Sequence, residues 1–523
     1  MNTDTIKDEK LYRNLWILIL ISFVVRGTMA AVLDLGNDEV YYWTYALFPD
    51  WSHFDHPSMI GWSIQLFSFD LLFDHEFFIR LSSLVFGAIN TYLIFSIGTK
   101  LKDQKTGWYA ALLYTASLYG FVITGIFILP DTPQMLFWFL SINIIIVILP
   151  SKQPTSHEKK LFLLASLMMG LAMLSKYTSA FLCIGTGLYI LFFNRNWLKT
   201  YAPYLGAILS ALCIIPVFIW NYKNDFISFT FHGDRVGLTE SGINWGTFFT
   251  ELGGQIGYNN PVVYILIVIA LIGLFKRNYF NTPNKYFLLF TALPMIGLFL
   301  GFALFKRTLP HWTAPAVTSL IFFPAAWLAD KHSKTIPNAI KAALGLLALV
   351  LILGIGQIQF GFMDSLMRKG IDDQSLGKYD VTLDMYGWDQ IQEPFAQLVK
   401  SDIEKGLMDS NSVIISNKWF PAAHLDYYVA TPLNMNLLCI GSLIDIHKYD
   451  WINKDRGGFK KGMNAYFLTT STQFYDPLIK SRYIKYFNSI ELADTIKIVR
   501  SNRHVKNVFV FRMKDLDEIP LSK

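Results

Sequence analysis

Side chains suited to acid–base chemistry cluster between residues 34 and 62 of this 523-residue chain. The acidic pair Asp38-Glu39 comes first and is followed at once by Tyr41 and Tyr42. A carboxylate within hydrogen-bond reach of a hydroxyl can accept its proton, so the pair could provide a general base. The pair could also simply cap a helix, because Asp is favoured at helix starts. The aromatic and histidine-rich continuation favours a site for a polar substrate.

The same stretch continues with His53, Asp55 and His56. These side chains could bind a metal ion or contact a phosphate, although their spacing is far less specific than the HExxH zinc motif. We interpret His53 as structural and expect Asp55 and His56 to belong to a site. Asp38, Asp55 and His56 together could hold a divalent metal, and the sequence neither requires nor excludes one.

A second acid, Asp131, lies in the segment Pro130-Asp131-Thr132-Pro133 at the start of an apolar run. Proline in a first helical turn, and an acid near the positive end of a helix dipole, are both typical of an ordinary helix start. The alternative is a second acid in the same site, which would bind an acceptor or a metal.

Basic side chains that could bind a phosphate follow at wide spacing, since ammonium and guanidinium groups bind phosphate through charge-assisted hydrogen bonds. They are Lys176, Arg235, Lys306 and Arg307, with His232 and His311 beside them. Lys306 and Arg307 could instead anchor a loop.

Long apolar segments must position these side chains. The chain is 53% hydrophobic and 16% charged, with a mean hydropathy of +0.35, whereas a soluble domain carries about a quarter charged residues. Apolar runs of roughly 18 or more residues can cross a bilayer. We therefore expect a polytopic α-helical membrane protein with about eleven spanning helices. The expected spans are 13–33, 77–99, 107–128, 132–149, 161–176, 178–193, 202–220, 260–275, 285–305, 312–330 and 338–360, with an interfacial helix at 58–73.

The loops between these spans give an orientation. With the N-terminus inside, the inner loops carry clusters of Lys and Arg, as the positive-inside rule requires. An odd number of spans then puts the tail outside, together with residues 34–62, Asp131, Lys176, the 221–259 loop and residues 306–311. Basic residues are not expected on that side, which favours a site role for Lys306-Arg307. The net charge of +6 is dispersed over short loops, which argues against a nucleic-acid partner.

The tail has a different pattern. Short apolar runs at 412–416, 465–470, 496–499 and 508–511 alternate with helix-like segments at 388–405 and 477–487. This pattern predicts a small α/β domain. The sequence therefore divides into a transmembrane domain at 1–360 and an external, extracytoplasmic α/β domain at 361–523, which has neither a GxGxxG motif nor a P-loop.

Five motifs taken in order resemble a known family. They are NDEVYYW, DWSHFDHPSMIGW, LPDTPQMLFW, GLAMLSKYT and KRTLPHWTAP. Together they are similar to a bacterial branch of the GT-C membrane glycosyltransferases, within glycosyltransferase family 39. That family includes the protein O-mannosyltransferases and the lipid A aminoarabinose transferase. The resemblance runs from the first expected helix to about the tenth.

The resemblance implies an inverting glycosyltransferase that moves a sugar from a polyprenyl-phosphate donor to an acceptor outside the membrane. The acceptor would be a glycolipid such as lipid A, a polysaccharide or a protein. Asp38 matches the catalytic base of the family, and Asp131 matches the acid that orients acceptor or base. The remaining implied roles are donor-phosphate binding by Lys176, Arg235, Arg307 and His56, and substrate binding by Glu39, Tyr41, Tyr42, Asp55, His232 and His311.

This chain departs from the family at Asp55-His56, where the aminoarabinose transferase has an acid–lysine pair. Phosphate binding by His56 is therefore open, and so is a divalent metal, the one cofactor considered. The implied localisation is the bacterial cytoplasmic (inner) membrane, multi-pass, with the active site and the tail on the periplasmic side. The alternative function is a transporter or flippase of a lipid-linked sugar, which would favour inverted repeats and charges at mid-membrane.

Overall fold

The computed structural model describes residues 3–236, 242–331, 335–367, 372–473 and 476–520. By its internal contacts the chain forms two compact units. The transmembrane unit contains Met1–Ala31 and Pro49–Val350, and the C-terminal unit contains Val32–Phe48 and Leu351–Lys523. The short segment at 32–48 thus groups with the tail, although more than three hundred residues separate them in sequence.

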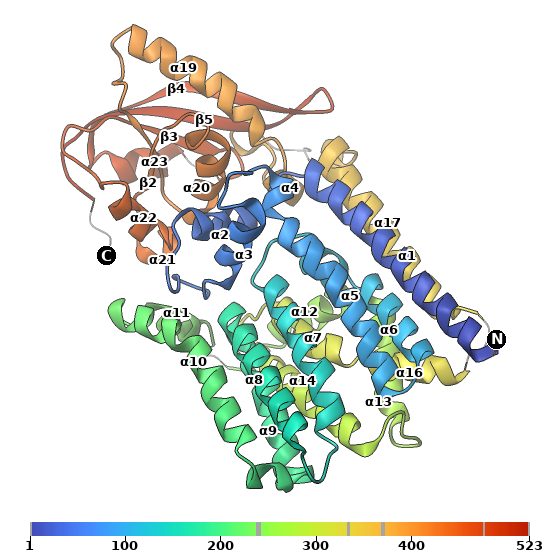
Figure 1. Cartoon of the computed structure of the whole chain (residues 1–523). Helices are drawn as coiled ribbons and strands as arrows, with labels where there is room; N and C mark the ends of the chain where they lie inside the picture. The colour runs from blue at the N-terminus through green and yellow to red at the C-terminus, as the bar shows by residue number, and fades with distance from the viewer. Residues whose placement is uncertain (1–2, 237–241, 332–334, 368–371, 474–475, 521–523) are drawn as a thin grey trace. The chain divides into compact units, whose positions relative to one another are not determined.

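The transmembrane unit is built from helices (Figure 1). Its α-helices are α1 (Thr3–Val32), α3 (Met59–Ser68), α4 (Glu76–Ile79), α5 (Leu81–Leu101), α6 (Gln104–Ala116), α7 (Asp131–Ile148), α8 (Ser156–Ser175), α9 (Ala180–Phe193), α10 (Ala202–Lys223), α11 (Ile227–Val236), α12 (Trp245–Tyr258), α13 (Pro261–Gly273), α14 (Thr282–Ala303), α15 (Ala314–Ser319), α16 (Phe322–Lys331) and α17 (Asn338–Phe360). Shorter turns are η1 (Tyr119–Ile123), η2 (Tyr177–Ser179), η3 (Arg195–Lys199) and η4 (Pro310–Thr313).

Six helices of the described residues are long and apolar enough to cross a membrane: α1, α5, α7, α10, α14 and α17. Two bent pairs raise this number to eight at most, α12 with α13 at 102° and Pro310–Ser319 with α16 at 44°. A polytopic helical membrane protein is therefore confirmed, whereas the expected count of eleven spans is not. The expected continuous helix at 312–330 is wrong, because the chain breaks between α15 and α16.

A second expected helix, 107–128, is also interrupted. Helix α6 ends at Ala116, and the π-helical turn η1 follows. The side chain of Arg26, which is fully buried, donates hydrogen bonds to the carbonyls of Gly120 (3.0 Å) and Phe121 (3.1 Å). A buried carbonyl that leaves the helical ladder needs another donor, and a guanidinium supplies several. Arg26 thus stabilises the break that the apolar pattern concealed.

The expected outer loop at 221–259 contains helices α11 and α12. The sharp bend that follows α12 is organised by Asn260, whose backbone has a φ of 65°. Its amide group donates to the carbonyls of Ala116 and Ala343, both at 2.9 Å, and its side-chain oxygen caps α13 through the Val262 N–H. Asparagine tolerates a positive φ better than most residues, so one residue both turns the chain and donates hydrogen bonds to two buried carbonyls.

The C-terminal unit is an α/β domain with a five-stranded sheet in the order β2-β1-β3-β5-β4. Strands β1 (Val413–Ser416), β2 (Leu437–Cys439) and β3 (Ala465–Thr470) are parallel, and β5 (Arg503–Leu516) pairs antiparallel with β3 and with β4 (Phe487–Arg500). The α-helices are α2 (Asn37–Leu47), α18 (Asp364–Met367), α19 (Gln392–Glu404), α20 (Trp419–Leu425), α21 (Leu443–Ile446), α22 (Tyr449–Asp455) and α23 (Asp476–Tyr483). Shorter turns are η5 (Asp373–Ser375), η6 (Val381–Met385), η7 (Asp389–Ile391) and η8 (Asp426–Ala430).

Both faces of this sheet are covered. Neighbouring residues of a strand point to opposite faces, and Tyr466 meets Phe395 of α19 while Phe467 meets Tyr483 of α23. Helices α19 and α23 accordingly lie on opposite sides of the sheet in Figure 1. Burial on both faces explains why β1 and β3 read as continuous apolar runs. The predicted α/β tail is confirmed, although β4 is much longer than the predicted run at 496–499.

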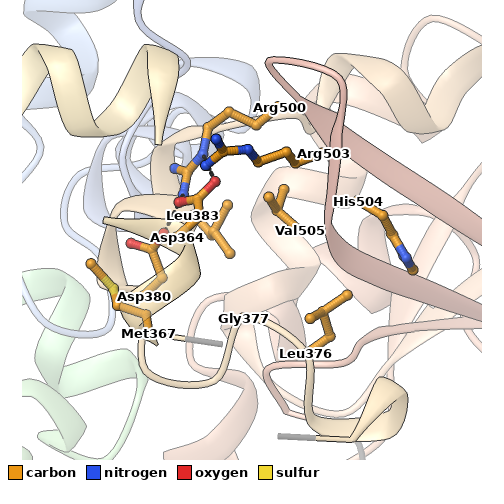
Figure 2. Close-up of a pocket in the computed structure, with 10 residues that line it drawn as sticks. All are labelled: Asp364, Met367, Leu376, Gly377, Asp380, Leu383, Arg500, Arg503, His504 and Val505. Atoms are coloured by element: carbon orange, nitrogen blue, oxygen red, sulfur yellow. Dashed lines mark hydrogen bonds and ion pairs between the residues drawn. The ribbon is translucent and has the colours of Figure 1, made fainter. Parts of the chain in front are cut away.

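A buried ion cluster ties the end of α17 to the β4–β5 hairpin. The Arg500 side chain is fully buried and pairs with both Asp364 and Asp380. Figure 2 shows its guanidinium beside the two carboxylates, whereas His504 lies apart from them. Gln357 of α17 donates to the same two carboxylates. Buried charges need this degree of pairing to offset the cost of leaving water.

The first prediction concerns this cluster. Arg500→Met leaves two buried carboxylates without their cation, so we expect the free energy of unfolding to fall by about 3–5 kcal/mol. Arg503→Met is the matched control, because Arg503 belongs to the same hairpin but is exposed, and a surface change usually costs no more than about 0.5 kcal/mol. Urea unfolding of the full chain in detergent measures both. Equal losses in the two variants would contradict a special role for Arg500.

Candidate active site

The acidic pair opens helix α2 in the C-terminal unit, and its two members differ. Glu39 is buried, and its carboxylate accepts the Gly36 N–H at 2.8 Å in a capping box at the start of the helix. Asp38 is exposed in the first turn. Glu39 therefore has the structural role that the sequence left open for the pair, while the carboxylate of Asp38 is accessible to a reacting group.

The N-terminal end of α2 is fixed by side chains of the tail. The Leu35 N–H donates to the Tyr428 hydroxyl at 2.7 Å, and the Leu35 carbonyl accepts from His424 Nε2 at 3.0 Å. Asn37 donates to Asp384 at 3.0 Å. Burial lowers the pKa of His424 to about 3, so this imidazole is neutral at pH 7 and keeps one N–H for Leu35. These bonds set where the first turn, and with it Asp38, begins.

The C-terminal end of α2 is fixed by one lysine. Lys448 is 4% exposed, and its ammonium donates to the carbonyls of Thr44 at 3.0 Å and Phe48 at 2.5 Å. It also lies 4.7 Å from the ring centre of Tyr45. The last carbonyls of a helix lack partners within the helix and carry its negative dipole end. The buried Lys448 ammonium therefore supplies a hydrogen-bond donor to these carbonyls and a positive charge at the negative end of the helix dipole.

Tyr41 and Tyr42, predicted to bind substrate, are 2% and 5% exposed. Tyr41 packs against Trp419 (5.2 Å between ring centres) and against His447 (5.8 Å). Both rings belong to the tail, so Tyr41 helps to hold α2 on the C-terminal unit. A direct role for these tyrosines in sugar binding stays a prediction.

In the transmembrane unit, Asp131 and Lys176 form a buried ion pair. Lys176 Nζ lies 2.6 Å from Asp131 Oδ2, and the two side chains are 5% and 3% exposed. The other carboxylate oxygen accepts the Tyr119 hydroxyl at 2.9 Å. Asp131 begins α7 and Lys176 follows the last residue of α8, so two helix ends bring together side chains that lie 45 residues apart.

The loop at 49–58 lies against α10 and α11 in the same unit. Ser228 donates to the His53 carbonyl at 3.0 Å, and Trp220 donates to Asp50 at 2.7 Å. His232 Nε2 donates to the Asp55 carbonyl at 2.5 Å. The rings of His56 and His232 are 5.7 Å apart, so the predicted loop and helix residues meet.

His56 is close enough to Lys176 and Asp131 for their charges to act on it, and its ring is partly buried. Burial lowers the pKa of His56 to about 3, and this effect exceeds the opposing influence of Asp55. The ring is therefore neutral at pH 7. It can donate one N–H to an anion, but it adds no positive charge.

The other predicted residues differ in what surrounds them. His311, in η4, lies close enough to Lys176 and Asp131 to interact with their charges. Arg307 is exposed, before η4. Arg235 belongs to α11, but its side chain lies outside the described residues.

Two polar residues of the transmembrane unit escaped the sequence analysis. The Tyr119 hydroxyl donates a hydrogen bond to Asp131. Glu251, in α12, is 1% exposed, and its carboxylate accepts the Thr308 hydroxyl at 2.8 Å. Glu251 could have been found, because a lone acid in an apolar helix usually faces a partner inside the protein. Tyr119 had no such signal, since tyrosine is common throughout this chain.

A metal site finds no geometric support. Within the described ranges, no group of three or more His, Cys, Asp or Glu side chains could hold a metal ion. The set Asp38, Asp55 and His56 is therefore not among such groups.

Comparison with known proteins gives a family match over part of the chain and a fold over nearly all of it. Residues 55–220 match the model of the dolichyl-phosphate-mannose-protein mannosyltransferase family. This range contains Asp131, Lys176 and His56. ArnT from Cupriavidus metallidurans in the apo state has a similar structure, with a TM-score of 0.59 at 12% sequence identity, covering 95% of this chain and 97% of that one.

The predicted resemblance to GT-C membrane glycosyltransferases is confirmed. ArnT from the same organism bound to undecaprenyl phosphate is also similar, with a TM-score of 0.57 and 14% identity over 94% of this chain and 97% of that one. No curated protein sequence matches the chain. Because the coverage of both ArnT structures exceeds nine-tenths, the GT-C fold extends over the helical part and the C-terminal sheet.

The second prediction concerns the buried pair of this GT-C fold. Asp131→Ala leaves the Lys176 ammonium buried without its carboxylate, so we expect the unfolding free energy to fall by about 3–5 kcal/mol. Asp131→Ala/Lys176→Met removes both charges and should recover part of this loss. Thermal unfolding in detergent compares the two. A double variant less stable than Asp131→Ala would show that the pair is not the stabilising contact.

Proposed function

We propose that this GT-C protein is an inverting glycosyltransferase that moves a hexosyl or pentosyl group from a polyprenyl-phosphate carrier to an acceptor outside the membrane. The acceptor is a glycolipid such as lipid A, a polysaccharide or a protein hydroxyl. The family match and the ArnT complex with undecaprenyl phosphate support the lipid-phosphate donor. We place the enzyme in the bacterial cytoplasmic membrane, with its active site and C-terminal unit on the periplasmic side, as the loop charges predict.

The observation that carries the proposal is Lys176. Its ammonium has three donors, and only the bond to Asp131 is formed with a described side chain. A lysine that is 4% exposed and has donors to spare suits a phosphate, because charge-assisted bonds are strong where water is excluded. In this proposal His56 adds a neutral N–H donor, and Arg307 and Arg235 add positive charge.

We assign the base to Asp38. Its carboxylate takes the proton of the acceptor hydroxyl while that oxygen attacks the anomeric carbon. The bond from the anomeric carbon to the phosphate oxygen breaks, and polyprenyl phosphate leaves with the bonding electron pair. One proton moves to Asp38, and the added negative charge on the leaving phosphate is stabilised by the basic residues. Attack opposite to the leaving phosphate gives inversion.

The third prediction tests this assignment. Asp38→Asn keeps the shape of the side chain but cannot accept the proton, so we expect the transfer rate to fall by about 10²–10⁴-fold. The measurement is transfer from a synthetic polyprenyl-phosphate sugar to membrane extract, with the product identified by mass. Asp389→Asn is the control, because Asp389 is an exposed acid of the same unit outside the proposed site.

Two outcomes would contradict the proposal. Full transfer by Asp38→Asn would show that the base is another residue. Flux of the lipid-linked sugar across vesicles without any covalent product, from folded wild-type protein, would favour the transporter or flippase alternative.

A further inference from the structure

A cavity of about 490 Å³ lies at one edge of the C-terminal sheet. Asn417, Lys418, Trp419 and Phe420 line it from the segment directly after β1. Phe467, Thr469 and Gln473 line it from β3 and the residues that follow, and Ile479, Arg482 and Tyr483 line it from α23. The cavity is therefore built on the carboxyl ends of two neighbouring parallel strands.

The strand order of the sheet reverses at this edge. From β1 the chain continues to β2 on one side, and from β2 it crosses back to β3 on the other side of β1. The carboxyl ends of β1 and β3 thus lie at the point where the strand order reverses. Open α/β sheets bind ligands in the crevice at such a point, and about 300–1,000 Å³ is the usual size of a small-molecule site.

The lining indicates the chemistry of the ligand. Lys418 and Arg482 are exposed cations, and no carboxylate whose side chain the structure describes pairs with either. Trp419, Phe420 and Tyr483 supply aromatic surface, while Asn417, Gln473 and Thr469 supply donors and acceptors for hydroxyl groups. Two unpaired cations suit a phosphate or carboxylate, and the aromatic and amide groups suit a sugar ring.

One buried hydroxyl in the cavity wall lacks a well-formed hydrogen bond. The Tyr483 side chain is 1% exposed, and within the part of the chain that the structure describes its hydroxyl makes no hydrogen bond of good geometry, although Arg482 in the same wall is close enough to interact with it. Buried hydroxyls are nearly always bonded. A ligand hydroxyl or phosphate oxygen would satisfy it.

We propose that this cavity is a binding site for an anionic saccharide, a sugar that carries a phosphate or carboxylate. Its wall is continuous with the helix of the acidic pair, because Trp419 packs on Tyr41, and Tyr41 lies one turn after Asp38 on α2. The role that follows, and that rests on the proposed function, is to hold the charged sugar of the acceptor.

The binding test uses the full chain in detergent and three probes: a hexose phosphate, the same hexose without phosphate, and inorganic phosphate. Calorimetric titration should show that the hexose phosphate binds more tightly than either fragment. Lys418→Gln/Arg482→Gln should weaken this binding by about tenfold or more, while Lys405→Gln/Lys461→Gln, which changes exposed cations away from the cavity, should leave it unchanged.

Tyr483→Phe removes only the buried hydroxyl, so it should weaken the binding of hexose phosphate severalfold without lowering the unfolding temperature. Unchanged hexose phosphate binding in Lys418→Gln/Arg482→Gln, no binding of any probe, or equal affinity for inorganic phosphate would each overturn an anionic saccharide site.

The transfer test separates this site from the proposed function. In the glycosyl transfer assay, Lys418→Gln/Arg482→Gln should raise the KM for the acceptor, with kcat and the donor KM retained. In one outcome the wild-type protein binds hexose phosphate, this binding is lost in Lys418→Gln/Arg482→Gln, and yet the wild type catalyses no glycosyl transfer. That result would refute the transferase function and support the binding site. An unchanged acceptor KM, with active wild type, would overturn the acceptor role.

Discussion

The contacts of Lys448 with the end of α2 are the interaction on which the proposed catalytic helix depends. A helix of 11 residues is marginal by itself in water. Lys448 occupies the carbonyls of Thr44 and Phe48 at one end, and Tyr428 and His424 bind Leu35 before the other. The position of Asp38 is therefore set by side chains of the tail rather than by the propensity of its own segment.

This arrangement explains why the C-terminal unit contains a segment from near the N-terminus. On the sheet, helix α20, the turn η8 and residues 447–448 before α22 present aromatic and basic side chains to α2. The Arg500 cluster joins the β4–β5 hairpin to Gln357 in the last turns of α17, which from Leu351 onward belong to the C-terminal unit. The tail thus positions the carboxylate of Asp38. The cavity at the carboxyl ends of β1 and β3 is the proposed ligand site next to the residues that hold α2.

The transmembrane unit keeps the Lys176 ammonium buried, away from bulk water. Asp131, which also accepts the Tyr119 hydroxyl, pairs with Lys176 and takes one of its three donors. A buried pair of this kind adds little net stability compared with an apolar core. In the proposed function, a charged ligand such as the donor's lipid phosphate accounts for its presence.

The sequence predicted much of this because membrane sidedness restricts where polar residues can go. Asp131, Lys176, His56, His232 and His311 come from separate segments, yet the loop charges placed them on one side, and they meet in the structure. The α/β tail followed from its apolar runs, of which 465–470 coincides with β3.

What the sequence could not supply depends on long-range contacts. The break after Ala116 relies on hydrogen bonds from Arg26, and a hydropathy pattern does not record hydrogen bonds. The neutral state of His56 follows from burial that no local pattern encodes. The grouping of 32–48 with the tail depends on partners such as Lys448, which lies about four hundred residues away in sequence.

A double-mutant cycle between Lys448 and Asp38 tests the central claim most directly. The rate of transfer from a polyprenyl-phosphate sugar is measured for wild type, Lys448→Met, Asp38→Asn and the double variant. If Lys448 acts by positioning the base, Lys448→Met should lower the rate about tenfold when Asp38 is present and hardly at all in Asp38→Asn, a coupling of about 1–1.5 kcal/mol. The same loss in both backgrounds would contradict the account, because Lys448 would then act independently of Asp38.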